Sequence, residues 1–272
     1  MLARTVVLDR ALEALPLFRL SDSGEEVAIT YATEGGGRWR VLPAPGERLP
    51  GTFDQDVYVE LLRRYHEADA PADGTLTFTL HDFLRTMGRR VDGRTYEQLR
   101  SALTRLQRTA LESTAAWVDA ASGDRWTGQF TILTTVAIDR RRLTDRDQLA
   151  LFSTLTNNEP GDAHVTLSPQ VRSNIAAGFT ITLSSARYGQ LSSPVARRLY
   201  RLLQVARSEV GRTWAIPLER LAEQLPLTQR YPSHLQRVLQ PAHEMLLAAG
   251  VLRTAVMVPR EKTWMVEYQL AD

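Results

Sequence analysis

The sequence predicts an α+β fold built from two similar units. Amphipathic helices alternate with short strands along the chain, and the same order of elements occurs twice. The apolar anchors of the two halves also correspond, for example Leu99 with Leu235 and Leu103 with Leu239. Identity between the halves is low, so the repeat lies in the order and spacing of the elements. With 272 residues, of which 43% are hydrophobic, the chain is long enough for two cores.

Alternation of apolar residues, turn residues and helix caps define the elements of the first half. They are expected in this order: strands at 25–33 and 38–42 around the turn EGGG, a helix at 52–68, a strand at 76–80, a short helix at 81–88, a helix that starts after Asp92, and a hairpin of residues 115–120 and 126–138. The role of the first hairpin is not predicted.

The second half repeats this succession. Its expected elements are a strand at 164–167, a helix at 168–178, a strand at 179–184, a helix at 192–209 with Pro194 in its first turn, a strand at 212–216, a short helix at 217–225, a helix at 231–250, and a hairpin of residues 251–258 and 263–270.

Helix, short strand, short helix, longer helix and hairpin are the elements of a winged helix-turn-helix. In that fold the longer helix enters the major groove of DNA and the hairpin, the wing, lies beside it. The sequence therefore predicts two tandem winged-helix domains, at residues 1–139 and 163–272, joined by a polar linker at 140–162. We expect this linker to fold against one domain, because its apolar residues 149–152 would be costly to expose to water.

The helix of the first unit that follows Asp92 has an apolar stripe, including Leu99, Leu103 and Leu106. Its opposite face is expected to carry polar residues that suit DNA: Arg94, Gln98, Ser101, Arg105 and Arg108. A solvated amphipathic helix would show the same pattern, so this helix alone does not indicate function.

The corresponding helix of the second unit, at 231–250, favours the DNA interpretation. Its outward face is expected to present Ser233, Gln236, Arg237 and Gln240, which are residue types that contact base edges and phosphates. The wing adds Arg253, Arg260 and Lys262. Pro241 is expected to kink this helix or to end its regular first half.

Composition narrows the remaining classes of function. The chain has no cysteine, its net charge is +2, and Lys262 is its only lysine. An arginine-rich composition suits phosphate binding, but a GC-rich genome or a hot habitat also produces it. No apolar run is long enough for a membrane span or a signal-peptide core, so a cytoplasmic protein is expected.

Enzyme and cofactor motifs are absent from the sequence. The only lysine does not lie in a phosphate loop, and the glycines at 35–37 lack the strand and helix of a dinucleotide site. The histidines lack metal-ligand spacing, and His234 and His243 are expected to have surface or packing roles. We therefore expect a protein without catalytic residues, metal or cofactor.

Four segments resemble the replication initiator protein A family of bacterial plasmids: FDQDVYVELLRR, TYEQLRSALTRLQRTALES, FTILTTVAID and LQPAHEMLLAAGVL. The resemblance covers the chain from about residue 15 to its end. It implies a tandem winged-helix initiator that binds repeated sites (iterons) at a plasmid origin. It also implies opening of the origin together with host initiator and helicase-loading proteins. The C-terminal unit would read the sequence, while the N-terminal unit would mediate homodimerisation or grip neighbouring DNA.

Two alternatives remain open at the level of sequence. A winged-helix transcriptional regulator would have the same fold and no replication role. A protein-interaction module would use the fold without DNA, although it would not need arginines on both long helices and a basic wing.

Overall fold

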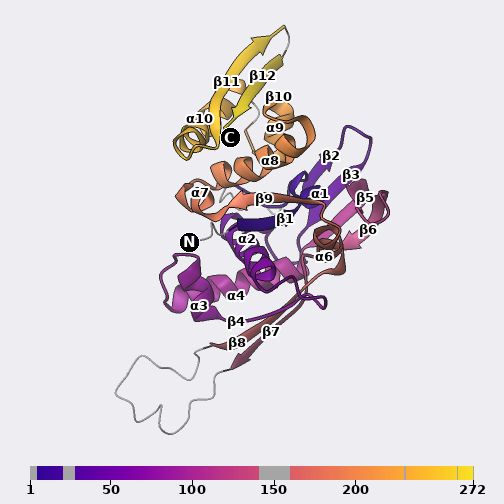
Figure 1. Cartoon of the computed structure of the whole chain (residues 1–272), viewed down its shortest axis with the longest axis vertical. Helices are drawn as coiled ribbons and strands as arrows, with labels where there is room; N and C mark the ends of the chain where they lie inside the picture. The colour runs from indigo at the N-terminus through magenta and orange to yellow at the C-terminus, as the bar shows by residue number, and fades with distance from the viewer. Residues whose placement is uncertain (1–4, 21–27, 141–159, 230, 262, 272) are drawn as a thin grey trace.

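The computed structural model describes residues 5–20, 28–140, 160–229, 231–261 and 263–271. It contains two winged-helix units, which lie one above the other along the longest axis of the molecule (Figure 1). Their wings point to opposite ends of that axis. The predicted fold of two tandem winged helices is therefore confirmed.

The two units share one topology. The first consists of α2 (Thr52–Glu67), β4 (Thr75–Thr79), α3 (Leu80–Thr86), α4 (Gly93–Arg108), β7 (Leu133–Arg140) and β8 (Pro160–Leu167). The second consists of α8 (Pro194–Val210), β10 (Thr213–Pro217), α9 (Leu218–Gln224), α10 (Pro232–Ala248), β11 (Leu252–Arg260) and β12 (Thr263–Leu270). The antiparallel sheets have the orders β4-β8-β7 and β10-β12-β11, so in each the last strand lies in the middle.

The wing of the first unit is not the hairpin that the sequence indicated. The predicted hairpin forms, as β5 (Ala110–Val118) and β6 (Arg125–Phe130), but it joins β2 (Ile29–Ala32) and β3 (Arg38–Leu42) in a separate sheet of order β2-β3-β5-β6. Aromatic packing explains the placement, because Phe130 of β6 contacts Trp39 and Trp117 at ring-centroid distances of 6.1 and 5.5 Å. The strand expected at 126–138 divides into β6 and β7, and β7 pairs with β8 as the wing.

The expected boundary between the domains is also wrong. Strand β8 pairs with β4 and β7, so residues 163–167 belong to the sheet of the first unit and not to the second domain. Residue 140 ends β7 and residue 160 begins β8, so the described ends of the predicted linker are parts of the wing. The remainder of that linker, including the apolar residues 149–152, lies outside the described residues.

Elements from both halves of the chain build a shared centre between the units. Strand β1 (Thr5–Asp9) pairs with β9 (Thr180–Ser184), and these strands are flanked by α1 (Arg10–Glu13), α6 (Pro169–Ala176) and α7 (Ser185–Gln190). Asp9 is buried there and accepts hydrogen bonds from Ala11 N, Trp117 Nε1 and Asn174 Nδ2. Burial raises the pKa of Asp9 to about 7, against the effect of these donors.

A buried ionic cluster fixes the second unit to this centre. Glu13 receives hydrogen bonds from Arg198 Nη1 at 3.1 Å and from Arg201 Nη1 at 3.0 Å, and all three side chains are at most 1% exposed. Arg201 also donates from Nη2 to Gln55 Oε1 of α2 at 2.6 Å. Desolvation, reinforced by the neighbouring Arg201, lowers the pKa of Arg198 to about 10. Because unpaired buried charges are costly, these bonds hold α8 in one position against the first unit.

The N-terminal hairpin, whose role the sequence did not indicate, braces the second unit. Tyr31 of β2 accepts hydrogen bonds from Arg220 Nη2 at 3.0 Å and from Gln224 Nε2 at 3.1 Å, and both donors lie on α9. The guanidinium of Arg220 also lies 4.8 Å from the centre of the Tyr31 ring. The first helix of the second helix-turn-helix, α9, is therefore held by the four-stranded sheet β2-β3-β5-β6.

Candidate nucleic-acid interface

Helix α10 has a strongly apolar side and a polar outward side. Leu235, Leu239, Ala242 and Leu246 recur at helical spacing and are buried against the core of the second unit. The side chains predicted to face outward are all exposed: Ser233, Gln236, Arg237 and Gln240. They lie within two turns of one another, beside the wing, so a single duplex could contact all of them.

Pro241 does not end the helix as expected. Helix α10 continues from Pro232 to Ala248 with Pro241 inside it, exposed at the edge of the outward side. Because proline has no N–H group, the carbonyl oxygen of Arg237 lacks the donor that an i+4 residue supplies in a regular helix. The outward side of α10 therefore offers a main-chain acceptor in addition to its side chains.

The start of α10 is open to an anion. Tyr231 is the N-cap residue, and its side chain forms no capping hydrogen bond with the first turn. Pro232 has no N–H group, and His234 N and Leu235 N donate to Tyr231 O. The N–H of Ser233 and the positive end of the helix dipole are therefore what the start of α10 offers to a phosphate group. Tyr231 is 69% exposed and its ring lies 5.6 Å from that of His234. Sequence reasoning missed Tyr231, because it precedes the helical periodicity that identified the other candidates.

The wing of the second unit supplies further polar groups. Arg253 and Arg260 are exposed, and Arg260 Nη2 donates to Glu267 Oε1 at 2.8 Å. This ion pair neutralises part of the positive charge that the sequence assigned to the wing. Lys262 lies outside the described residues. Trp264 lies opposite Pro259 near the tip and is 36% exposed, and it was not among the predicted residues.

On α4 the prediction is wrong for Arg105. Four of the expected outward residues are exposed: Arg94, Gln98, Ser101 and Arg108. Arg105 is only 6% exposed and donates to both carboxylate oxygens of Asp54, at 2.7 and 3.1 Å. The residue lies at the margin of the apolar stripe, and the helical pattern did not reveal that α2 places a buried carboxylate there. Arg105 is therefore a core ion pair and is unsuited to DNA contact.

The ends of α4 are also occupied by groups of the protein. Asp92 caps its first turn by accepting a hydrogen bond from Thr95 N at 2.9 Å, which puts a carboxylate where α10 has none. At the other end Arg108 lies 3.4 Å from Glu47. Arg85, in the last turn of α3, and Arg90, just before α4, are both exposed, and sequence reasoning did not single them out. The outward side of α4 is positive but carries its own counter-charges.

The two histidines of the second recognition helix differ in environment. His234 is exposed, whereas His243 is buried with its Nε2 2.9 Å from the hydroxyl of Tyr268 on β12. Burial lowers the pKa of His243 to about 4, so its ring is neutral at physiological pH. The expected surface and packing roles are thus confirmed. No group of three or more His, Asp or Glu residues within the described ranges is arranged to hold a metal ion.

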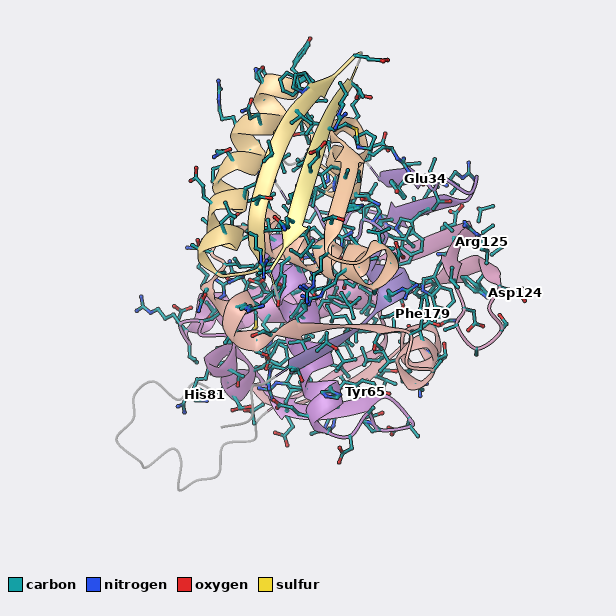
Figure 2. All side chains as sticks on the ribbon, turned by 45° about the horizontal axis from the view of Figure 1, so that its top comes forward. Glu34, Tyr65, His81, Asp124, Arg125 and Phe179 are labelled. Carbon is teal, nitrogen blue, oxygen red and sulfur yellow. The ribbon has the colours of Figure 1, made fainter. Side chains whose placement is uncertain are left out.

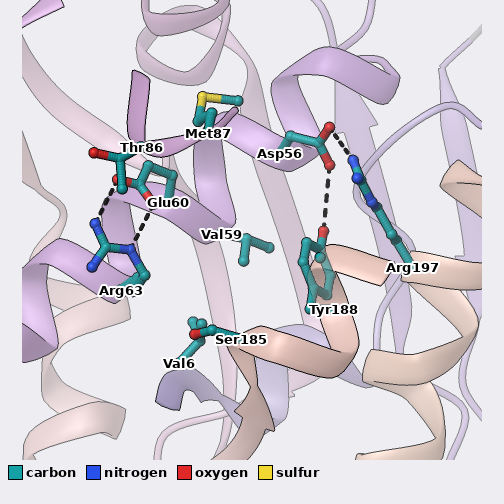
Figure 3. Close-up of a pocket in the computed structure, with 11 residues that line it drawn as sticks. Val6, Asp56, Val59, Glu60, Arg63, Thr86, Met87, Ser185, Tyr188 and Arg197 are labelled. Atoms are coloured by element: carbon teal, nitrogen blue, oxygen red, sulfur yellow. Dashed lines mark hydrogen bonds and ion pairs between the residues drawn. The ribbon is translucent and has the colours of Figure 1, made fainter. Parts of the chain in front are cut away.

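Two other features lie away from α10. Figure 2 shows that Glu34, Asp124 and Arg125 mark the four-stranded sheet, on the opposite side of the second unit from α10. A cavity of about 190 Å³ lies where α2 meets α7 and α8 (Figure 3). In its wall Asp56 accepts hydrogen bonds from Arg197 and Tyr188, and Glu60 accepts from Arg63. The bond of Asp56 with Arg197 joins α2 to α8, whereas the Glu60–Arg63 pair lies within α2.

Among the described residues no helix is both long and apolar enough to traverse a lipid bilayer.

Comparisons with known proteins agree with this architecture. Among solved structures, a selenomethionine derivative of domains 2 and 3 of RctB matches with a TM-score of 0.63 and 11% identity, covering 97% of this chain and 99% of that chain. The Pi initiator protein, solved in complex with iteron DNA, matches with a TM-score of 0.57 and 13% identity, covering 99% of this chain and 98% of that chain. At these identities the likeness shows the fold.

The sequence comparisons identify the family. No curated protein matches the chain by sequence. Residues 8–245, however, match the family described as Replication initiator protein A, so the match spans both units and ends within α10. The chain therefore belongs to the replication initiator protein A family.

Proposed function

We propose that this protein is a sequence-specific initiator of replication that binds repeated sites in double-stranded DNA at a plasmid origin. It promotes opening of the origin together with host replication initiator or helicase-loading proteins. It acts in the cytoplasm through binding and deformation of DNA, without a catalytic step of its own.

The observation that carries this proposal is the outward side of α10. Arginine reads guanine and glutamine reads adenine in the major groove, and α10 exposes Gln236, Arg237 and Gln240 in adjacent turns. The uncapped start of the helix suits a phosphate, which would set its depth in the groove. A protein of the same fold, the Pi initiator, was solved in complex with iteron DNA. Membership of an initiator family supports the role in replication.

The shared centre between the units supports binding of one DNA duplex by both units. The second unit is held against the first by the cluster around Glu13 and by the contact of Tyr31 with α9. A protein that grips DNA at two places through a rigid connection can impose a bend or a change of twist on the duplex between them. We propose that this rigidity transmits binding energy into distortion of the origin. A second copy of the chain and the host proteins complete the assembly.

The test uses the full chain and the DNA that surrounds its gene. Footprinting with the wild-type protein should protect direct repeats of about two helical turns each, if both units contact one face of the DNA. The same DNA, cloned without another origin, should replicate in cells only when the protein is supplied.

Two variants separate the outcomes. Arg237→Ala should weaken the footprint and reduce replication, whereas Glu34→Gln, on the remote sheet, should leave both at the wild-type level. A footprint without replication would identify a transcriptional regulator. The absence of any sequence-selective footprint would reject the proposed function.

A further inference from the structure

The C-terminal half of the outward side of α10 presents hydrogen-bond acceptors. Glu244 is exposed and accepts a hydrogen bond from Gln240 Nε2 at 2.9 Å. It lies seven residues, or about two turns, after Arg237, and therefore on the same line of the helix. The carbonyl oxygen of Arg237, which Pro241 leaves without its helical donor, lies in the same region.

Glu244 is the only acidic residue of α10. It lies just before the last turn of α10, so the helix dipole does not favour a negative charge there. A side-chain pair such as Glu244 with Gln240 stabilises a typical helix by only a few tenths of a kcal/mol. A carboxylate also repels DNA phosphates. Neither helix stability nor general affinity for DNA therefore explains an acidic group at this place.

Selective contact with a base does explain it. In the major groove only cytosine and adenine offer an exocyclic amine as a donor, at N4 and N6 respectively. The bond from Gln240 Nε2 to Glu244 orients the amide so that its Oε1 remains an acceptor. Glu244 and Gln240 thus form an acceptor pair, while Arg237 supplies donors about one turn before Gln240.

We propose that Glu244, positioned with Gln240, is a specificity-determining residue that selects an amine-bearing base, cytosine or adenine, within each repeat. The proposal rests on the proposed function, since it requires α10 to lie in the major groove. At other bases the carboxylate meets acceptor atoms and phosphates, so it also weakens binding to DNA of unrelated sequence.

The experiment compares full-length wild-type protein with Glu244→Met on a series in which each base pair of the repeat is changed in turn. Methionine keeps an unbranched side chain and high helix propensity while removing the acceptor. We expect wild type to prefer cytosine or adenine at one position by at least about fivefold, the lower end of one base contact. Glu244→Met should lose this preference and should bind random DNA more tightly. Glu34→Met, away from α10, is the matched control and should keep the wild-type profile.

Base analogues identify the contact. At the selected position, 2-pyrimidinone in place of cytosine or purine in place of adenine removes only the exocyclic amine. This change should weaken wild type and leave Glu244→Met unaffected, and it also shows which of the two bases is read. An unchanged preference at every position in Glu244→Met would overturn the inference while leaving the proposed function intact. A wild-type protein that selects no sequence would instead reject the proposed function.

Discussion

Helices α4 and α10 occupy the same place in two similar units, yet their polar residues are used differently. Arg105 of α4 enters the core and pairs with Asp54, whereas the outward polar residues of α10 stay exposed. When the helices are aligned on Leu99 with Leu235 and on Leu103 with Leu239, Arg108 corresponds to Glu244, so even the charge at that position is reversed. Duplication of a winged helix therefore does not duplicate its binding face.

The N-terminal ends of α4 and α10 also differ in whether a protein group occupies them. Asp92 caps α4 with a carboxylate, while α10 starts without a side-chain cap. An anion such as a DNA phosphate gains from a free helix N-terminus and is repelled by a carboxylate already placed there. This contrast indicates that α4 is built into the scaffold and α10 is built to meet a ligand. The following experiments can break or sharpen that distinction.

The largest effect is expected for Asp54→Ala. This change leaves the guanidinium of Arg105 buried without its partner, which typically costs about 3–5 kcal/mol in the free energy of unfolding. Urea denaturation followed by circular dichroism would measure it. The exposed Gln236→Ala on α10 should change stability by no more than about 0.5 kcal/mol. Similar losses for the two variants would remove the distinction between the helices.

A double variant tests the cause of that loss. Asp54→Leu combined with Arg105→Met replaces the ion pair by apolar side chains, and such replacements are often neutral or stabilising. We expect this protein to recover most of the stability that Asp54→Ala loses. Asp54 also accepts a hydrogen bond from Gly51 N at 2.6 Å at the start of α2, and both Asp54 variants lose it. If the double variant does not recover, this lost cap or the packing of α2 against α4, rather than the unpaired charge, explains the loss.

A second effect is on the pH dependence of stability. Helix α10 is held by the neutral contact of His243 with Tyr268, whereas α4 is held by the ion pair of Arg105 with Asp54. The pKa of His243 is lowered to about 4 in the folded protein, against 6.5 for an unperturbed histidine. The unfolded chain therefore binds more protons between these values, and stability falls as the pH decreases from about 6.5 to about 4. Relative to His243→Gln, wild type should lose up to about 3 kcal/mol across this range.

The measurement is the difference in unfolding free energy between wild type and His243→Gln at several pH values. Taking the difference removes contributions shared by both proteins, such as that of Asp9. A constant difference from pH 4 to pH 7 would show that His243 is not a buried neutral ring.

The third effect is on recognition. Arg237→Ala should weaken binding to a cognate repeat by about 1–3 kcal/mol and should change binding to random DNA little. Fluorescence anisotropy on both DNAs would measure this. Equal losses on both would reassign Arg237 to phosphate contact, which would make α10 resemble α4.

The smallest effect is on salt dependence. If the outward side of α4 grips the DNA backbone, Arg94→Ala should reduce the slope of log K against log salt by about one. Arg108→Ala should have a smaller effect, because Glu47 already lies 3.4 Å from its guanidinium. An unchanged slope in both variants would indicate that this face is a protein interface. Sedimentation of the same variants would then show whether it joins two copies of the chain.

The sequence predicted the positions of helices and strands more reliably than the pairing of the strands. Helical periodicity and caps located α2, α4, α8 and α10, and the repeat of anchors indicated two winged helices. The pairing of β7 with β8 was missed, because the two strands are separated by residues 141–159 and local patterns do not show such long-range pairing. The first unit contains a second hairpin, β5–β6, which competed for the role of the wing.

The outward side of α10 was predictable because burial follows one helical stripe. Arg105 was not, since its position depends on a carboxylate of another helix 51 residues earlier, at Asp54. Tyr231 and Glu244 were missed for a different reason: a search for basic and amide side chains passes over an aromatic cap and an acidic residue. Periodicity predicts which residues of a helix face outward. What such a residue does depends on the residue that it contacts from another element, which periodicity does not reveal.

The pairing of β1 with β9 has a consequence for how the chain is made. Asp9 lies opposite Thr180, so during synthesis β1 finds its partner β9 only after the residues between them have followed. At about 5–20 residues per second, that interval is roughly 10–30 s. During it the four-stranded sheet β2-β3-β5-β6 can form, but the carboxylate of Glu13 has neither Arg198 nor Arg201 to pair with. The joining of the two units is therefore a late step of synthesis, and the two units of a nascent chain are not fixed relative to each other before it occurs.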